Sequence, residues 1–598
     1  MTETFSIDGI KSLPEALFRS AEQHAGSPAQ WYREQGVYLP VTYAQLVTQI
    51  RHTTSGLLRD GFKAGDRIGL LMENRPEWAV IDYAILSIGA VTVPLYCSYR
   101  ASDIAYVLND SGAVAVLTSG NKLLRHVLKA TEQCKQIKQV YVVDSTTEAE
   151  HTLIKTLVSL QAGEIEEEKL EKCLANIDKN TLASIVYTSG TTANPKGVML
   201  THGNFITNLE SVPASIDLTA GEHGDCMLSF LPLAHALERT GGHFLTYSFG
   251  LSVAFAERPD TVAKNMSEAR PTMMISVPRM LEVVRNRILS QVSQQSGFKQ
   301  ALFQAFLKLA LKKWARNEPL GLIASLQLRL LDKLVGEKIR LRFGGRLRVF
   351  VCGGAPLSVE VAEFFEALKL PVIEGYGLTE SAPLLAVNPM SDRRLGTVGV
   401  AGKGVELKIA DDGEILARGG NIMPGYWRNK KATRETLIDG WLHTGDIGRL
   451  CPDGYLSITD RKKDIIVNSG GENIAPQRIE GLLTVDEAID QMVVYGDQKP
   501  YLVALVVPNE DACTAWAKTQ GLPESDWQHL CESEVLKKYL QNKIGALLKP
   551  LNPFEQVRRI HLLQQPFSIE AGTLTPTMKV KRRAVYKQYA DTIAALYG

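Results

Sequence analysis

The sequence predicts an α/β fold with a large N-terminal domain and a small α+β C-terminal domain. The large domain is expected to hold two βαβ-type sheet subdomains and a β-barrel-like subdomain. Residues 14–140, and again those from 182 onward, alternate helical patterns with short apolar runs, which is typical of βαβ units. Residues 397–458 carry short strand patterns between Gly-rich turns. At 598 residues, the chain is longer than one hydrophobic core normally supports.

The first alternating stretch predicts three strands with helices between them. The strands are expected at 67–72, 90–95 and 113–118, and the helices at 76–86 and 101–108. The second stretch continues in the same way. Its strands are expected at 182–187, 198–200, 228–231, 251–255, 272–277, 347–351 and 371–374, with a helix at 358–368.

Residues 298–348 differ from this pattern and predict long, basic, Leu-rich helices. Twelve Lys and Arg stand there against three Asp and Glu. One interpretation is a solvated basic surface, which is common on helices. The other is contact with an anionic membrane surface. Because the chain has no run of about 18 apolar residues, any membrane contact is expected to be peripheral.

Composition narrows the class of protein. Hydrophobic residues make up 45% and charged residues 22%, as in ordinary globular enzymes, and a net charge of +1 gives no reason to expect nucleic acid as a partner. The eight cysteines form no C-x-x-C pair, which favours reduced thiols in the cytoplasm. No signal-peptide pattern occurs in the first 26 residues.

The C-terminal part predicts a compact unit of its own. Paired strands are expected at 493–495 and 502–507, a helix at 534–548 and a further strand at 560–563. We therefore divide the chain into 1–459, a connecting segment 460–463, and 464–598.

One turn between two apolar runs has the chemistry of a polyphosphate site. Its residues are Thr188, Ser189, Gly190, Thr191, Thr192, Ala193, Asn194, Pro195, Lys196 and Gly197. Glycine admits close backbone approach, N–H groups and hydroxyls donate to phosphate oxygens, and the ammonium offsets their charge. The spacing differs from the G-x-x-x-x-G-K-[ST] loop, and the same residue types also suit a plain turn.

The full string closely resembles the phosphate-binding loop of the adenylate-forming superfamily, which includes acyl-CoA synthetases and luciferases. Five further strings match that superfamily in order and span nearly the whole chain. In the string Pro232–His235, His235 implies a ring beside the substrate carboxylate, and the residues after it resemble the long-chain and bubblegum-type branches. Gly241 and Gly242 are expected to leave room for an alkyl chain, and Arg239 stands where some long-chain members have an aromatic gate.

The next strings imply nucleotide contacts. By resemblance, Gly353, Gly354 and Ala355 bind adenine, and Tyr376, with Gly377 beside it, stacks on the base. Thr379 is implied to hydrogen-bond the α-phosphate, and Glu380 to hold Mg²⁺. Asp446 and Arg461 resemble the ribose-binding pair, since a carboxylate accepts two hydrogen bonds from adjacent hydroxyls.

The last strings imply a moving lid. Lys463 matches the hinge about which the small domain swings. Lys579 matches the mobile catalytic lysine, with Met578 where most members have glycine and Lys581 as the nearest competitor. By resemblance, Gly470 and Gly471 line the path of the CoA thiol after the swing.

The resemblance implies an AMP-forming acyl-CoA synthetase of the long-chain fatty acid branch, with ATP, Mg²⁺ and CoA. Residues 1–459 would then bind AMP and the acyl group, and 464–598 would form the lid. Two alternatives remain: an adenylating enzyme, such as a fatty acyl-AMP ligase, that loads a carrier protein, and a non-catalytic nucleotide or lipid sensor. A homodimer is a further hypothesis.

Overall fold

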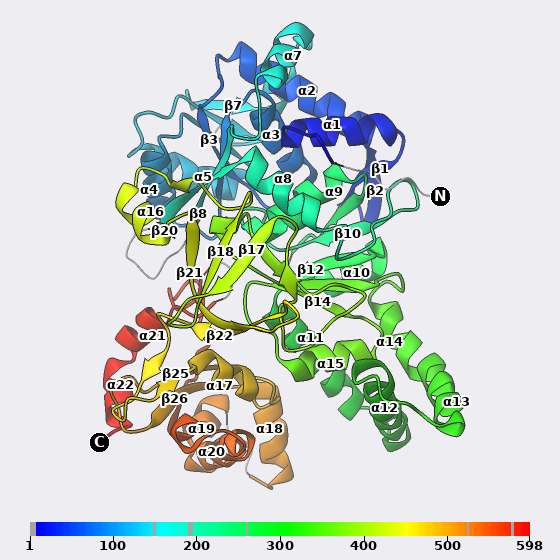
Figure 1. Ribbon diagram of the computed structural model, residues 1–598, viewed down its shortest axis with the longest axis vertical. Helices are drawn as coiled ribbons and strands as arrows, with labels where there is room; N and C mark the ends of the chain where they lie inside the picture. The colour runs from blue at the N-terminus through cyan, green and yellow to red at the C-terminus, as the bar shows by residue number, and fades with distance from the viewer. Residues whose placement is uncertain (1–6, 148–150, 189–194, 259–260, 523–525, 576–578) are drawn as a thin grey trace.

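The computed structural model describes residues 7–147, 151–188, 195–258, 261–522, 526–575 and 579–598. Figure 1 shows two large sheets with their helices in the upper part of the molecule. The C-terminal elements form a smaller unit below them, and a helical arm projects at the lower right. The mixed α/β architecture that the sequence predicts is confirmed.

A nine-stranded sheet forms one half of the large part. Its middle strands run parallel, whereas β2, β15 and β16 pair antiparallel at the edges. In spatial order the strands are β16 (Val400–Ala401), β15 (Leu384–Val387), β14 (Val372–Gly377), β13 (Val349–Gly353), β12 (Met273–Ser276), β10 (Cys226–Ser229), β11 (Ser252–Phe255), β1 (Pro28–Glu34) and β2 (Val37–Thr42). Because the parallel strands share one direction, their carboxyl ends lie along one edge, where α/β sheets bind ligands.

An eight-stranded sheet forms the other half. From β8 to β7 neighbouring strands are parallel, whereas β9 and β19 are antiparallel. In order they are β19 (Gly425–Tyr426), β9 (Lys196–Thr201), β8 (Leu182–Thr188), β4 (Val91–Leu95), β3 (Arg67–Leu71), β5 (Ala115–Thr118), β6 (Gln139–Val142) and β7 (Ile154–Thr156). The predicted phosphate turn therefore connects two neighbouring strands, β8 and β9, with Thr188 opposite Lys196.

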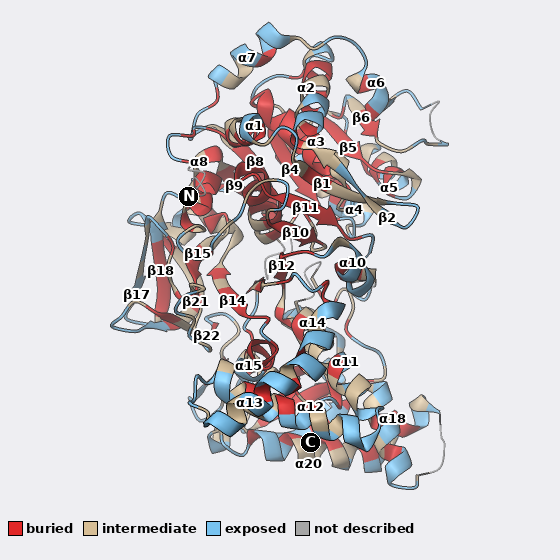
Figure 2. Cartoon of the chain, turned by 90° about the vertical axis from the view of Figure 1, so that its right-hand side faces the viewer, coloured by how far each residue is buried: buried red, intermediate tan, exposed pale blue. Residues whose placement is uncertain are grey.

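Buried residues, red in Figure 2, fill the core between the two sheets, and several helices contribute to it. Helix α3 (Pro76–Ser87) is the clearest case, because nearly every residue from Trp78 to its end is buried. Such a helix lacks the apolar stripe of a surface helix and belongs inside a large protein.

A five-stranded antiparallel sheet occupies the region predicted to be barrel-like. It consists of β17 (Val405–Ile409), β18 (Glu414–Gly419), β21 (Trp441–Leu450), β20 (Leu437–Ile438) and β22 (Leu456–Arg461). Its long strand β21 pairs with β22, which leads directly into the C-terminal unit.

The C-terminal unit has its own sheet and core. Strand β26 (Leu502–Pro508) pairs antiparallel with β25 (Ile489–Tyr495) and parallel with β27 (Val557–Leu562). Helices α17 (Pro476–Leu483) and α20 (Glu534–Leu548) supply buried residues such as Ile479, Leu536 and Leu540 to this core. The bounds of α20 match the predicted helix, because its apolar residues recur at helical spacing along its whole length.

The basic region predicted to be helical forms two consecutive rods. The first is α12 (Gly297–Ala310) with the π-turn η3 (Leu311–Ala315). The second is α13 (Leu322–Leu331), the π-turn η4 (Asp332–Gly336) and α14 (Glu337–Arg342). Among the described helices, none is both long and apolar enough to cross a bilayer.

Candidate active site

The strand ends bring together the residues that the sequence assigned to adenine. Gly353 ends β13 and Gly377 ends the neighbouring strand β14, and the register places Gly353 opposite Gly375. Gly354 follows with φ of 87°, a left-handed conformation that glycine adopts without strain. Small residues at this edge leave the backbone open to a flat ligand.

Gly377 also allows a close turn behind it. A Cβ at this position would lie 1.7 Å from the Pro383 carbonyl oxygen, so no other residue fits there without moving backbone. The turn holds the 3₁₀ helix η5 (Thr379–Ser381), which carries Thr379 and Glu380 at the strand end.

Tyr376, Asp446 and Arg461 form one hydrogen-bonded group. The Tyr376 hydroxyl donates to Asp446 Oδ2 at 2.8 Å, and Arg461 Nε lies 3.4 Å from Asp446 Oδ1. Asp446 and Arg461 face each other in the register of β21 and β22. Burial raises the pKa of Asp446, and the Arg461 guanidinium opposes that rise. This side-by-side carboxylate and guanidinium can bind a sugar diol.

Lys579 lies against this group. Leu574 forms an antiparallel bridge with Val580, and the Lys579 amide donates to Thr575 Oγ1 at 3.0 Å. We call the bridged residues 574–575 and 579–580 the C-terminal hairpin. The pKa of Lys579 is lowered to about 8, first by burial and then by the Arg461 charge, while the Asp446 carboxylate opposes both. Its competitor from the sequence, Lys581, is exposed on the far side of the hairpin's last bridge.

His235 faces the same ammonium. It follows β10 in a turn closed by a 2.8 Å hydrogen bond from its own amide to the Pro232 carbonyl. Burial lowers its pKa to about 3, and the Lys579 charge acts in the same direction. The ring is therefore neutral at pH 7 and can lie beside a carboxylate without adding a charge of its own.

Glu380 belongs to a second group that includes the phosphate turn. The Tyr426 hydroxyl donates to Glu380 Oε1 at 2.7 Å, and Lys196 Nζ lies 5.0 Å from the centre of the Tyr426 ring. Tyr426 thus connects the carboxylate to the ammonium. Sequence reasoning missed Tyr426, because a Tyr in a two-residue strand carries no local signal of a contact with residues so distant in the chain.

Part of the predicted phosphate turn cannot be placed in this geometry. Ser189, Gly190, Thr191 and Thr192 lie outside the described residues, whereas Thr188 and Lys196 hold the two strand ends beside them.

Arg239 does not stand at an opening as a gate would. Its side chain is fully buried and forms an ion pair with Asp82 at 2.6 Å, and it donates to Ser184 Oγ at 2.6 Å. His243 Nε2 lies 3.1 Å from the other oxygen of Asp82. Burial alone would raise the pKa of Asp82, but Arg239 and His243 hold it below its usual value. The resemblance to an aromatic gate therefore does not extend to Arg239. This residue instead connects Asp82 of α3 with Ser184 of the eight-stranded sheet, called the second sheet below.

Gly241 and Gly242 lie in the π-helix η1 (Glu238–Phe244), beside β12. A Cβ on Gly241 would lie 2.8 Å from Ile275 Cδ1, and one on Gly242 would lie 2.7 Å from Glu238 Oε1. Gly241 therefore lets η1 approach β12 closely, whereas Gly242 leaves room for the Glu238 side chain of η1 itself. Their contact with an alkyl chain stays a prediction.

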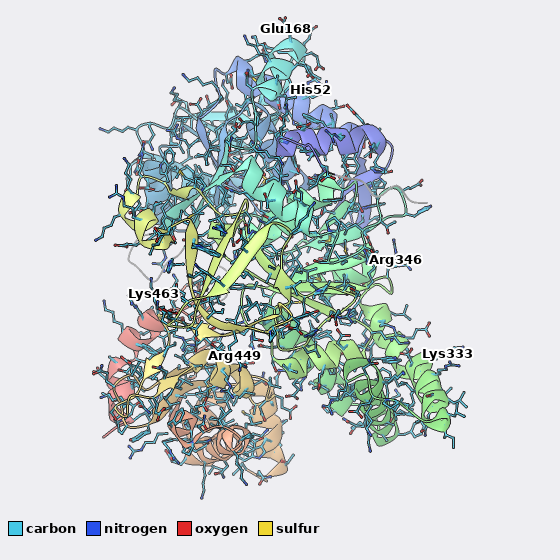
Figure 3. The ribbon with its side chains drawn as sticks, viewed as in Figure 1. His52, Glu168, Lys333, Arg346, Arg449 and Lys463 are labelled. Carbon is cyan, nitrogen blue, oxygen red and sulfur yellow. The ribbon has the colours of Figure 1, made fainter. Side chains whose placement is uncertain are left out.

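Gly470, Gly471 and Lys463 lie on the C-terminal side of the junction. Both glycines are exposed in the turn between β23 (Ile466–Val467) and β24 (Asn473–Ile474). Figure 3 shows Lys463 at the edge of the molecule, where the upper and lower parts meet. Lys463 is exposed in a turn closed by hydrogen bonds from the Asp464 and Ile465 amides to the Arg461 carbonyl, and its role as a hinge stays a prediction.

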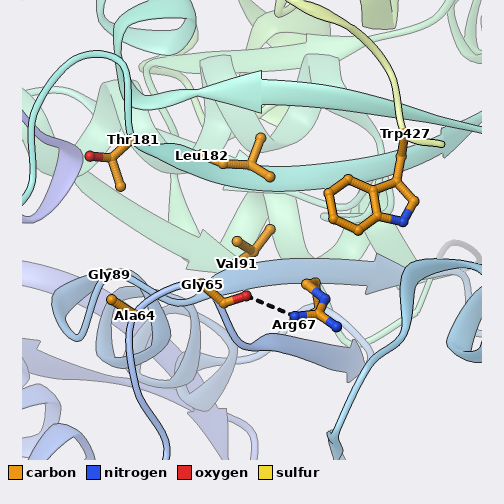
Figure 4. A pocket seen from close by; sticks show the side chains of 8 residues that line it. All are labelled: Ala64, Gly65, Arg67, Gly89, Val91, Thr181, Leu182 and Trp427. Carbon is orange, nitrogen blue, oxygen red and sulfur yellow. Dashed lines mark hydrogen bonds between the residues drawn. The ribbon is translucent and has the colours of Figure 1, made fainter. Parts of the chain in front are cut away.

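A pocket of ≈ 460 Å³ lies elsewhere and does not belong to this site (Figure 4). Its lining includes Arg67, Val91 and Leu182, which start β3, β4 and β8. Thr188 is at the opposite end of β8. The pocket is therefore at the amino ends of the strands.

Comparison with known proteins agrees with this geometry. A family described as AMP-binding enzyme matches residues 17–427, and the AMP-binding enzyme C-terminal domain matches residues 463–598. The chain belongs to the AMP-binding enzymes. The resemblance to the adenylate-forming superfamily is confirmed.

Relatives of this AMP-binding enzyme cover nearly its whole length. The long-chain-fatty-acid–CoA ligase FadD15 of Mycobacterium bovis is 35% identical, over 94% of this chain and 93% of the relative. The peroxisomal long chain acyl-CoA synthetase 6 of Arabidopsis thaliana is 33% identical, over 94% of this chain and 82% of the relative. The human long-chain-fatty-acid–CoA ligase 6 is 31% identical, over 100% of this chain and 88% of the relative.

Solved structures share the fold of the enzyme. The adenylation domain of a carboxylate reductase from Mycobacterium chelonae has a TM-score of 0.77 at 21% identity, covering 99% of this chain and 92% of its own. The fatty acyl CoA synthetase of Mycobacterium tuberculosis has a TM-score of 0.60 at 21% identity, covering 98% and 99%.

Proposed function

We propose that the enzyme activates a long-chain fatty acid with ATP and transfers the acyl group to CoA. The observation that carries the proposal is the position of Lys579, which the C-terminal hairpin holds against Asp446 and His235 of the large part and Arg461 of the connecting segment. The relatives named above are long-chain-fatty-acid–CoA ligases or long chain acyl-CoA synthetases, which supports the same substrate class.

In the first half-reaction, a carboxylate oxygen of the acid attacks the α-phosphorus of ATP. The bond from that phosphorus to the bridging oxygen breaks, and pyrophosphate leaves. Lys579 offsets the charge shared by the carboxylate and the α-phosphate, and Thr379 donates to the α-phosphate. Thr188, Lys196 and the turn between them hold the β- and γ-phosphates, mainly by positioning and charge. Tyr376, Gly353, Gly354 and Ala355 hold adenine, and Asp446 and Arg461 hold ribose.

Glu380 would hold Mg²⁺. Its Oε1 accepts the Tyr426 hydrogen bond, and Oε2 remains to meet the ion. The described residues contain no group of three or more acidic, His or Cys side chains arranged to hold a metal ion. This donor set fits Mg²⁺, which proteins commonly hold by one or two carboxylates together with phosphate oxygens and water. When bound, the ion would neutralise charge on the phosphates.

In the second half-reaction, the CoA sulfur attacks the acyl carbonyl carbon. The carbonyl carbon–oxygen bond to the phosphate breaks, AMP leaves, and the thiol proton passes to solvent. We propose that residues 464–598 rotate about Lys463 between the two steps, which removes Lys579 and brings Gly470 and Gly471 to the site. The large part, 1–459, stays fixed. A location in the cytoplasm stays a prediction.

A coupled assay tests the function. The enzyme with ATP, Mg²⁺, palmitate and CoA is expected to release AMP and pyrophosphate and form palmitoyl-CoA. If hydroxylamine traps acyl-AMP but no thioester forms when CoA is added, the enzyme is instead one that loads a carrier protein. No pyrophosphate with any acid from C2 to C24 would favour a sensor and contradict the proposal.

The pH dependence of adenylation is expected to report Lys579. Its ammonium is protonated below its pKa of about 8 and neutral above it, and only the charged form offsets the two anions. Above that pH, kcat/KM for pyrophosphate release should fall roughly tenfold per pH unit. In the Arg461→Gln variant the fall in kcat/KM should begin at higher pH, because Arg461 lowers the pKa of Lys579. If the fall begins at the same pH as in the unmodified enzyme, Lys579 is not the group whose deprotonation causes it.

Glu380→Gln is expected to reduce adenylation by about 10²-fold or more, since the amide would hold Mg²⁺ more weakly and the ion supplies a preorganised positive charge to the phosphates. The amide keeps the shape of the side chain, so the melting temperature should change little. Pyrophosphate release titrated with Mg²⁺ gives the measurement, and the variant should need more Mg²⁺. Glu435→Gln on the exposed helix α16 (Lys430–Thr436) is the control. An unchanged Mg²⁺ requirement would refute the metal role.

A further inference from the structure

The second rod of the basic arm presents apolar side chains to solvent. Leu322, Ile323, Leu326 and Leu330 are 87%, 82%, 65% and 60% exposed, and Leu334 and Leu341 continue the series. Single exposed apolar residues are normal on proteins, but a contiguous patch marks an interaction surface. Six large aliphatic residues along one rod form such a patch, which we call the arm patch.

The arm patch lies on one face of the rod. Leu322, Leu326, Leu330 and Leu334 follow each other at steps of four residues, which aligns them along a helix. The opposite face is buried, because Leu328 and Leu331 pack into the same core cluster as Phe303 and Phe306 of α12. The rod is thus held in place from behind and presents its apolar face as a preformed surface.

Basic residues flank the arm patch. Arg329, Lys333 and Lys338 are exposed, and among the described residues they have no ion pair. The nearby Asp332 already forms ion pairs with Arg340 and with Lys369, each at 2.7 Å. It therefore does not neutralise the three exposed cations. Glu337 is the one exposed acid of α13, η4 and α14, all of which are described. The surface is therefore both apolar and positively charged.

We propose that the arm patch docks on an anionic lipid bilayer. Exposed aliphatic side chains flanked by Lys and Arg are the pattern of helices that lie in a membrane interface, with the apolar residues among the acyl chains and the cations at the headgroups. Protein interfaces are instead enriched in aromatic residues, and the arm patch contains none.

The position of the arm permits this docking. In Figure 1 the arm projects from the body on the side away from α21 (Arg582–Gln588) and α22 (Ala590–Ala595), which flank the Lys579 hairpin. Figure 2 shows α13 at the molecular surface, with its exposed side facing the viewer.

Vesicle co-sedimentation of the full-length enzyme tests the proposal. The probes are vesicles of phosphatidylcholine alone and of equal parts phosphatidylcholine and phosphatidylglycerol. The enzyme is expected to bind the anionic vesicles at low salt and less at 0.5 M salt, because salt screens the lysines and arginines. Arg329→Gln with Lys333→Gln should weaken binding roughly 30-fold, and Leu326→Ser with Leu330→Ser at least tenfold.

Matched controls separate docking from loss of fold. Val158→Ser changes a residue that is 73% exposed on α6 (Leu157–Gln161), outside the arm, and should bind like the unmodified enzyme. All variants should keep the melting temperature and ATP–pyrophosphate exchange of the unmodified enzyme. Equal binding by the arm variants and the unmodified enzyme, or no preference for anionic vesicles, would overturn the proposal.

Light scattering after gel filtration tests the other occupant of the arm patch, a second copy of the chain. Under the proposal, the Leu326→Ser, Leu330→Ser variant has the same mass in solution as the unmodified enzyme. A dimer that this variant converts to a monomer, without vesicle binding by either protein, would make the arm patch a subunit interface and contradict docking on lipid.

Discussion

Lys579→Ala is expected to slow acyl-adenylate formation by about 10²–10³-fold, because it removes a preorganised charge from the step in which two anions meet. Lys579 lies with Arg461, Asp446 and His235, which is where the proposed mechanism has the carboxylate and the α-phosphate react. The second half-reaction, measured with supplied acyl-adenylate and CoA, should stay within a few-fold of the unmodified enzyme, since the proposed rotation removes Lys579 from the site for that step.

Lys581→Ala is the matched control for this prediction. Lys581 is two residues away in the chain, but it is exposed. Its replacement should leave both half-reactions nearly unchanged. Equal losses in both half-reactions for Lys579→Ala, or a larger adenylation loss for Lys581→Ala, would show that the catalytic lysine is assigned wrongly.

Asp82→Ala is expected to lower the free energy of unfolding by about 3–5 kcal/mol, because it leaves the buried guanidinium of Arg239 without its partner. Both side chains of this pair are fully buried. The Thr92 hydroxyl, which donates to Asp82 Oδ1 at 2.7 Å, loses its acceptor as well. Chemical denaturation followed by circular dichroism measures this loss in the free energy of unfolding. Added salt should not change the size of the loss, because the pair is shielded from solvent.

An exposed ion pair provides the comparison. Glu406 and Arg418 are 60% and 49% exposed, and Glu406→Ala should cost less than about 1 kcal/mol. The double variant Asp82→Ala, Arg239→Met should be more stable than Asp82→Ala alone, because no buried charge is left unpaired. If Asp82→Ala costs no more than Glu406→Ala, the buried group does not hold α3 to the second sheet.

Because the pKa of Asp82 is low in the folded protein, its contribution to the free energy of unfolding should depend on pH. Its pKa is below its usual value in the folded protein, so its stabilising effect is complete above an unfolded pKa of about 3.9 and is lost as the pH falls below it. The stability difference between the unmodified enzyme and Asp82→Asn should therefore narrow below about pH 4.

The sequence by itself determined the elements that have a local pattern. Helix α20 keeps its predicted bounds, since apolar residues at helical spacing need only one face to be buried. Strands β3 and β4 lie within one residue of prediction at each end, because short apolar runs between turn residues are typical of buried strands. The family followed from six strings whose order does not depend on how the chain folds.

Only the tertiary structure decided which distant side chains meet. Tyr426 and Glu380, like Asp82 and Arg239, are separated by many residues, and no periodicity of one segment reports a contact with another. The two lysines of the C-terminal string look alike in sequence, yet the hairpin turns Lys579 toward Asp446 and leaves Lys581 in water. The physical reason is that hydrogen bonds, burial and charge depend on separation in space, which the packing of the two sheets and the C-terminal unit sets.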